Sequence, residues 1–367
     1  SVKGDVTQTK GSLSVGGVQF TDSATQAIKV DTDNALTVTG TLNNKGGTVT
    51  VNNGKTLSVG ALGTRGTPAG NVTVTDGTLT VSNAAYTGTV TVTKGSMTTG
   101  DLNSGAVTLG TDVSSNATAG DLTVKGTLTV SGAVAVKNGT LTVDEDVDNN
   151  ANNIVVGGTH TSGKLVVDGA ITGSGALTVT KGSAEVGGVV TVADVAASQS
   201  LTVNGDVGTI TTNNGTIIVN GDVTTAITDI TTGTVTVNGN VKDLVAMTGG
   251  TLTVDDIETA VDASLSGVLN LNGAATITAS GAAATYAEIN VGSTGVLTID
   301  GKASQTITVT AMTGTGNAQA VINWTASDGN ITLPSGLFVN GGTPITSAIS
   351  DNTNNGTYTF DGTNFAK

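Results

Sequence analysis

Apolar and polar residues alternate along most of the chain in one short unit: glycine, any residue, an apolar residue, threonine and a second apolar residue. Examples are the segments 47–51, 77–81, 126–130 and 233–237. Apolar side chains two residues apart point to the same face of an extended strand, and the threonine between them points to the other face. β-Branched residues also favour extended backbone. Each unit therefore predicts a strand with one buried and one solvent-facing side.

The spacing of the units indicates that the strands stack in parallel. Apolar pairs start at Leu201, Ile217, Val235, Leu252 and Leu269, which are 16, 18, 17 and 17 residues apart. At about 17 residues per coil the chain would form roughly twenty coils spaced ~4.8 Å apart, a rod on the order of 100 Å long. The sequence therefore predicts an all-β fold, an elongated parallel β-solenoid. The residues expected to point inward are Leu201, Val203, Ile217, Val219, Val235, Val237, Leu252 and Val254.

The corners between strands and the N-terminal half of the chain also fit stacked coils. Asn or Asp comes after most pairs, usually with a glycine that tolerates positive φ, and stacking at one corner predicts a ladder of Asn side chains. Units starting at Gly120, Gly126, Gly132 and Gly139 are spaced 6, 6 and 7 residues apart, which suits successive sides of one triangular coil. The longer gaps at 144–153 and 279–290 predict corner loops.

Composition and charge exclude several classes of function. The net charge is -14 with 2% aromatic residues, and phosphate binding needs a basic surface, so nucleic acid is not an expected partner. No apolar run approaches the length of a membrane-spanning helix, so no membrane insertion is expected. The single histidine, His160, stands in a turn-like segment without a nucleophile motif. Sugar-cleaving β-helix enzymes need clustered acids and aromatic residues, whereas Arg65 and Trp324 are isolated, so the chain is not expected to be an enzyme or to need a cofactor.

Three weaker signals remain as alternatives. Asp144, Asp146 and Asp148 alternate as in the first half of a calcium loop, but the loop glycine and closing Glu are missing, so a solvated acidic loop competes with structural calcium. Stacked Thr-x-Thr units could order water on a flat face, although Ile218 and Asn270 interrupt them. Seven Asn-x-Thr sequons occur, about as many as chance gives for a chain this rich in Asn and Thr.

The last 37 residues differ in composition from the rest, with three of the four Phe residues, and the N-terminal stretch has strand-like pieces but no obvious polar cap. The predicted regions are 1–34 for an N-terminal assembly segment, 35–330 for the solenoid and 331–367 for a distinct small C-terminal β region. A terminal coil exposes unpaired backbone groups that can recruit another strand. We expect the N-terminal segment to pair with the C-terminal region of another copy. The apolar anchors of this contact would be Val15, Val18, Phe20, Phe338, Tyr358, Phe360 and Phe365.

The repeated unit ending in Asn-Gly or Asp-Gly resembles the β-solenoid stalks of autotransporter passengers and filamentous-haemagglutinin-like adhesins over residues 35–310. The rungs at 203–207 and 219–223 also resemble those of bactofilins, which polymerise end to end. This resemblance, with a first residue Ser1 that suits signal-peptide removal, implies a secreted surface protein. We expect a structural subunit of an extracellular filament or surface layer that assembles head to tail with copies of itself. The alternative is an adhesin stalk that displays a binding tip, with a surface glycan or the cell wall as its partner.

Overall fold

The computed structural model describes most of the chain. The described residues are 6–8, 13–19, 28–30, 35–43, 47–52, 54–66, 68–279, 281–301, 305–315, 319–324, 330–332, 339–340, 343–344, 349–351, 356–360 and 365–366. These residues form strands, turns and bridges without a helix. Two compact units are present, the N-terminal unit (Ser1–Thr191 and Gln199–Leu201) and the C-terminal unit (Val192–Ser198 and Thr202–Lys367). The predicted region boundaries near residues 34 and 330 stay a prediction.

Short parallel strands make up the N-terminal unit. Their bounds are β1 Val6–Gln8, β2 Leu13–Val15, β3 Val18–Gln19, β4 Ile28–Val30, β5 Leu36–Asn43, β6 Val49–Val51, β7 Lys55–Leu62, β8 Val72–Val74, β9 Gly77–Val81, β10 Ala85–Val92, β11 Gly95–Thr99, β12 Leu102–Leu109, β13 Gly120–Val124, β14 Leu128–Val130, β15 Val134–Val136, β16 Gly139–Val143, β17 Val147–Asp148, β18 Ile154–Val156, β19 Gly163–Val167, β20 Ile171–Thr172, β21 Leu177–Val179 and β22 Gly182–Val186. Two further strands, β23 Val190–Val195 and β24 Ser200–Val203, have residues in both units.

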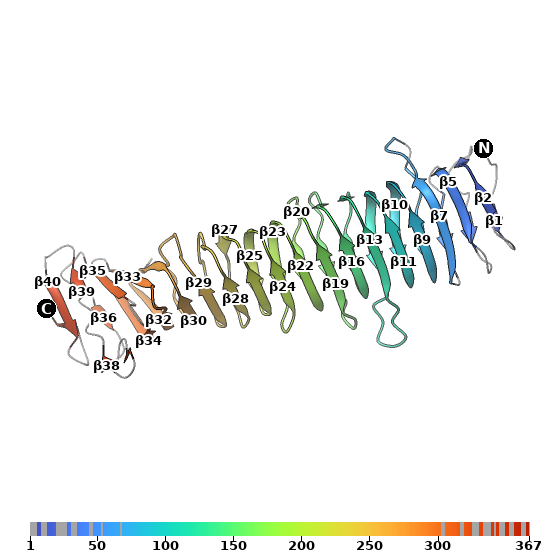
Figure 1. The fold of residues 1–367 in the computed structure, drawn as a ribbon. Coiled ribbons are helices and arrows are strands. Elements are labelled where there is room, and N and C mark those ends of the chain that lie inside the picture. The colour runs from blue at the N-terminus through green and yellow to red at the C-terminus, as the bar shows by residue number, and fades with distance from the viewer. Residues whose placement is uncertain are drawn as a thin grey trace. The chain divides into compact units, whose positions relative to one another are not determined.

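Three successive coils of the N-terminal unit, from Gly120 to Val179, have three sides each, as the spacing of units predicts. Strands β13, β14 and β15 form one coil, and they pair in parallel and in register with β16, β17 and β18 of the next coil. Figure 1 shows β13 and β16 side by side in the blue-green part of the ribbon. The prediction of a triangular coil starting at Gly120 is therefore confirmed.

The C-terminal unit continues the parallel pattern with a more irregular coil. Its strands are β25 Val207–Asn213, β26 Thr216–Val219, β27 Val223–Ile227, β28 Thr234–Val237, β29 Thr251–Val254, β30 Leu265–Leu271, β31 Ala274–Ile277, β32 Ala283–Val291, β33 Val296–Gly301, β34 Thr306–Gly314, β35 Gln319–Trp324, β36 Asn330–Thr332, β37 Val339–Asn340, β38 Thr343–Pro344, β39 Ile349–Asp351, β40 Gly356–Phe360 and β41 Phe365–Ala366. One side, from β26 through β28 and β29 to β30, pairs in register. The other sides of these coils are held partly by isolated bridges such as Val223 to Val241. Strands β37 to β41 pair antiparallel, unlike the solenoid strands.

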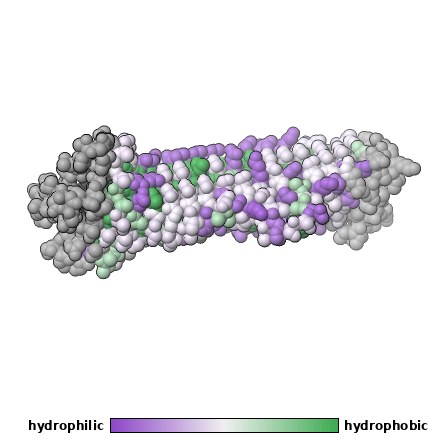
Figure 2. All heavy atoms as spheres, turned by 90° about the horizontal axis from the view of Figure 1, so that it is seen from below, coloured by the Kyte–Doolittle hydropathy of each residue, from purple (hydrophilic) through white to green (hydrophobic). Residues whose placement is uncertain are grey.

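The core of each unit is a column of aliphatic side chains. All eight residues predicted to point inward have an exposed fraction of 1% or less. Thr236 and Thr253, which lie between buried neighbours on their strands, are half-buried on the opposite face. On the face seen in Figure 2, weakly polar residues in white predominate over strongly hydrophobic ones. The period-two pattern therefore assigns the buried face correctly.

Two expectations about coil length are wrong. The segments 144–153 and 279–290 are not plain corner loops, because they contain β17 and most of β32. The chain also makes about 14 turns rather than about twenty. In the N-terminal unit the stacked positions Leu79, Met97, Leu122, Leu141 and Leu165 are 18, 25, 19 and 24 residues apart, because excursions lengthen the coils.

Candidate functional site

Six corners share one arrangement that links each coil to the next. An Asp or Asn side chain accepts a hydrogen bond from a backbone N–H one coil later, directly after a glycine whose Cβ would lie only 2.0–2.7 Å from the acceptor oxygen, and we call this the Asx–Gly clamp. The acceptor and donor residues are Asn71 with Thr89, Asp101 with Thr127, Asp146 with Ala170, Asp206 with Asp222, Asp222 with Asn240, and Asp256 with Ala274. Asp121 with Thr140 and Asn153 with Ala176 share the hydrogen bond after a glycine but not this close approach. In all six the acceptor precedes the donor in sequence, so the clamps run in one direction along the stack.

The glycine of the clamp makes room for the acceptor. A Cβ atom on Gly126 would lie 2.0 Å from Oδ1 of Asp101, and one on Gly221 would lie 2.2 Å from Oδ1 of Asp206. The φ angles of both glycines lie outside the left-handed region. At these two positions glycine is required by the close approach of a side chain from the previous coil rather than by positive φ. The expected positive φ occurs at other corners, such as Gly139 after Asn138 with a φ of 106°.

The predicted Asn ladder is present in the C-terminal unit. Nδ2 of Asn220 donates to Oδ1 of Asn204 at 2.8 Å, and Nδ2 of Asn238 donates to Oδ1 of Asn220 at 2.8 Å. The neighbouring outward column is uneven, since Ile218, Thr236, Thr253 and Asn270 follow one another on paired strands. A regular threonine surface that could order water is thus interrupted at the two positions expected from the sequence.

Two of the three candidate calcium residues, Asp146 and Asp148, accept hydrogen bonds from the backbone. Asp146 accepts from the N–H of Ala170 at 2.8 Å, and Asp148 accepts from the N–H of Asn150 at 3.0 Å, while Asp144 is exposed. Within the described part of the chain, no group of three or more Asp, Glu or His side chains could hold a metal ion. Structural calcium at Asp144, Asp146 and Asp148 stays a prediction without a ligand cluster to support it.

The predicted assembly residues fall largely outside the described side chains. Val15 belongs to β2 and Val18 to β3, and both strands pair in parallel with β5 of the same chain. Tyr358 and Phe360 belong to β40, and Phe365 belongs to β41. Phe20 and Phe338 lie outside the described residues.

His160 is held in a corner by Asp112. The carboxylate of Asp112 accepts from the backbone N–H groups of Thr159 and His160, each at 2.8 Å, across more than forty positions of sequence. The hydrogen bond from the His160 N–H, followed by that from Thr159, lowers the pKa of Asp112 below its ordinary value. Because these two hydrogen bonds come from the backbone of the corner, Asp112 has the geometry of a loop anchor.

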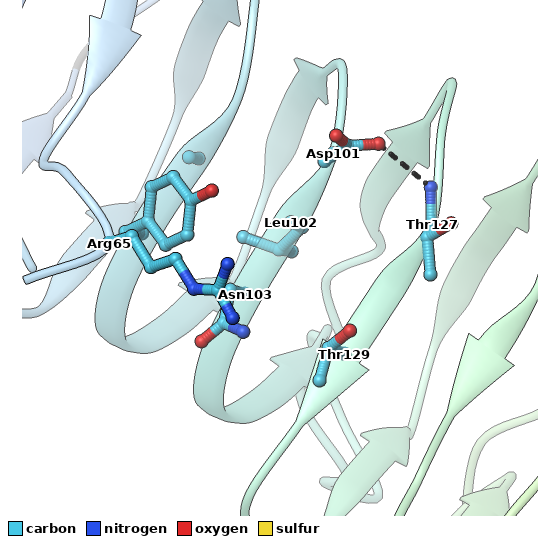
Figure 3. A pocket seen from close by; sticks show the side chains of 8 residues that line it. Arg65, Asp101, Leu102, Asn103, Thr127 and Thr129 are labelled. Atoms are coloured by element: carbon cyan, nitrogen blue, oxygen red, sulfur yellow. Dashed lines mark hydrogen bonds between the residues drawn. The ribbon is translucent and has the colours of Figure 1, made fainter.

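A shallow pocket of about 320 Å³ lies on the outer surface of the N-terminal unit, and its residues come from consecutive coils. Its lining consists of Arg65, Ala85, Tyr86, Asp101, Leu102, Asn103, Thr127 and Thr129. Figure 3 shows the Arg65 side chain extending toward Asn103, with Asp101 bonded to the backbone of Thr127 at the other side. Sequence reasoning treated Arg65 only as an isolated arginine, because its pocket partners are distant along the chain.

Comparison of the chain with protein family models, with curated proteins and with solved structures finds no match. The described residues include no helix able to cross a membrane. Function must therefore be inferred from the clamps, the ladder and the pocket themselves.

Proposed function

We propose that this protein is a structural subunit of an extracellular filament or surface layer that assembles head to tail through its N- and C-terminal ends. The observation that carries the proposal is the direction of the Asx–Gly clamps. Each clamped coil offers side-chain acceptors toward the following coil and backbone donors toward the preceding one. The six clamps lie between Asn71 and Ala274, and ends that continued this pattern would be complementary, because acceptors at one end would match donors at the other.

Head-to-tail contact between copies would extend the pairing that already holds the coils together. Parallel strands ~4.8 Å apart satisfy each other's backbone groups, and an added strand supplies main-chain hydrogen bonds together with side-chain pockets. The N-terminal segment would add to the C-terminal region of a neighbour. Its anchors Val15, Val18 and Phe20 would meet Phe338, Tyr358, Phe360 or Phe365 there. Because the two contact surfaces differ, the product is an open polymer.

Deletion of residues 1–20 tests this proposal. The intact chain should form particles that lengthen with concentration in light scattering and appear as filaments or sheets by electron microscopy, and the deletion should not. The variant Lys125→Gln, which changes an exposed side chain far in sequence from both ends, is the matched control and should assemble like the intact chain. Unchanged filaments after the deletion would refute strand donation. An intact chain that stays monomeric at high concentration would refute assembly and favour the adhesin stalk.

A further inference from the structure

The pocket around Arg65 contains an unused cation in an acidic protein. Arg65 is the only arginine of a chain with a net charge of -14, and its side chain is exposed. Elsewhere on the described surface, Lys94 pairs with Asp76 and Lys242 pairs with Glu258. No hydrogen bond or ion pair engages the Arg65 guanidinium within the described residues. A guanidinium with its donors free can bind a carboxylate through two parallel hydrogen bonds.

The residues beside Arg65 present an aromatic ring and neutral polar groups on neighbouring rungs. Tyr86 pairs with Asn103 in the parallel register of β10 and β12, and Asn103 pairs with Thr129 of β14. These three side chains therefore form one outward column. Ala85 and Leu102, which precede Tyr86 and Asn103 on their strands, are buried. A half-buried tyrosine offers a flat apolar face, while an amide and a hydroxyl supply both donors and acceptors.

Asp101 completes the rim of the pocket with a fixed carboxylate. Its Oδ1 accepts from the N–H of Thr127 at 3.1 Å, so the clamp holds the side chain in place. Oδ2 has no hydrogen bond to another described residue, and a carboxylate oxygen can accept from a hydroxyl group. The pocket thus combines one cation, one fixed acceptor, one ring face and several neutral polar groups.

We propose that this pocket binds a saccharide that carries a carboxylate, such as a uronic acid unit. The guanidinium of Arg65 pairs with the sugar carboxylate, the ring of Tyr86 packs against the apolar face of the sugar, and Asn103, Thr129 and Asp101 bind its hydroxyl groups. The volume of about 320 Å³ lies at the small end of ligand pockets and suits a single sugar ring with its substituents. A phosphorylated ligand fits less well, because the pocket lining contains one cation and one carboxylate. The proposal is independent of head-to-tail assembly.

Calorimetric titration of the full chain with uronic acid trisaccharides tests the proposal. Oligogalacturonate and oligoglucuronate are the acidic probes, and their methyl esters keep the sugar but remove the charge. At least one acid should bind, and its ester should bind about tenfold more weakly or less well still, since the charge-assisted contact is lost. Arg65→Gln should weaken acid binding by a similar factor and make acid and ester alike. Tyr86→Leu should weaken both probes together. Lys125→Gln removes an exposed cation outside the pocket and should change nothing.

Three results would overturn the proposal. No binding of either acid by the intact chain would show that the pocket is not a saccharide site of this kind. Equal binding by acid and ester, or by the intact chain and Arg65→Gln, would remove the role of the guanidinium. Loss of self-assembly in Arg65→Gln, with no saccharide binding by the intact chain, would identify the pocket as a contact between copies.

Discussion

Replacement of Gly126 by alanine isolates the steric part of one Asx–Gly clamp. The three nearest atoms to a Cβ at this position all belong to Asp101, and the closest, Oδ1, would be 2.0 Å away. That distance is not tolerated, so the Asp101 side chain must move and release the N–H of Thr127, which it now binds at 3.1 Å. Asp101→Ala removes the obstructing atoms and the hydrogen bond together.

The free energy of unfolding should respond with opposite signs in the two backgrounds. Losing the solvent-exposed hydrogen bond of the Thr127 N–H costs about 0.5–1.5 kcal/mol, and the forced movement of the Asp101 side chain adds to that cost. Alanine in place of glycine, at a φ that alanine can adopt, stabilises by about 0.4–1 kcal/mol through the unfolded chain. Gly126→Ala should therefore destabilise the wild type by about 1 kcal/mol but stabilise the Asp101→Ala protein by about 0.5 kcal/mol. With destabilisation counted as positive, the coupling free energy between the two changes is therefore about -1.5 kcal/mol.

Urea unfolding followed by circular dichroism measures the stability of the wild type, the two single variants and the double variant. If coils unfold separately, hydrogen exchange at Thr127 reports the local change in stability. Gly281→Ala is the control, because a Cβ there meets no atom within 4 Å. If Gly126→Ala lowers stability equally with and without Asp101, the clamp does not explain the glycine. The reasoning about all six corners would then be refuted.

Three further changes test the core, a buried hydroxyl and a loop anchor. Val237→Asp places a carboxylate at a position only 1% exposed and should destabilise the fold by more than about 4 kcal/mol. Hydrogen exchange should show loss of protection in β28 and in its partners β26 and β29. If these strands keep their protection, the assignment of Val237 to the buried face is wrong. Tyr286→Phe removes the donor that reaches the carbonyl of Val261 at 2.7 Å and should cost about 1–2 kcal/mol in urea unfolding, whereas an unchanged midpoint would show that this bond adds nothing. The pKa of Asp112 is lowered in the fold, so its contribution to the stability of the fold is complete above the ordinary pKa of about 3.9 and is lost as pH falls through the lowered pKa. The NMR amide shift of Thr159 should follow this titration and should not change with pH in Asp112→Asn. An identical titration in that variant would exclude the anchor.

The period-two pattern predicted the buried face because aliphatic residues and threonine rarely exchange places on these strands. It failed where polar or small residues carry the strand. In 144–153 the apolar signal is nearly confined to Val147, yet Asn149 is fully buried and donates to the carbonyl groups of Asn152 and Gly175. In β32 the buried positions include Ala284, whose residue type does not favour strands, and Tyr286, which favours strands but lies outside the repeated unit of glycine, threonine and aliphatic residues. Such segments become strands because the neighbouring coil offers backbone partners.

The pocket could not be read from the sequence for a related reason. Arg65, Tyr86, Asn103 and Thr129 are separated by 21, 17 and 26 residues, so no local motif links them. Their common location depends on the length of each coil, which varies with excursions such as the loop at 110–119 between β12 and β13. The regular spacing after residue 201 does not predict the coil lengths of the N-terminal half.

The direction of the clamps limits how copies of this chain could join. In each clamp a side-chain oxygen faces the following coil, and in most of them it belongs to a carboxylate. Joining two acceptor-bearing surfaces would bring like charges together, and neither surface would offer backbone donors to the acceptors of the other. Joining acceptor to donor repeats the contact that the chain already makes between its own coils. The Asn ladder adds a second constraint, because an amide column continues only when the next rung presents an amide at the same position. A polymer formed by coil stacking would therefore be polar, with all subunits pointing the same way, and a dimer related by twofold symmetry through these ends would be disfavoured.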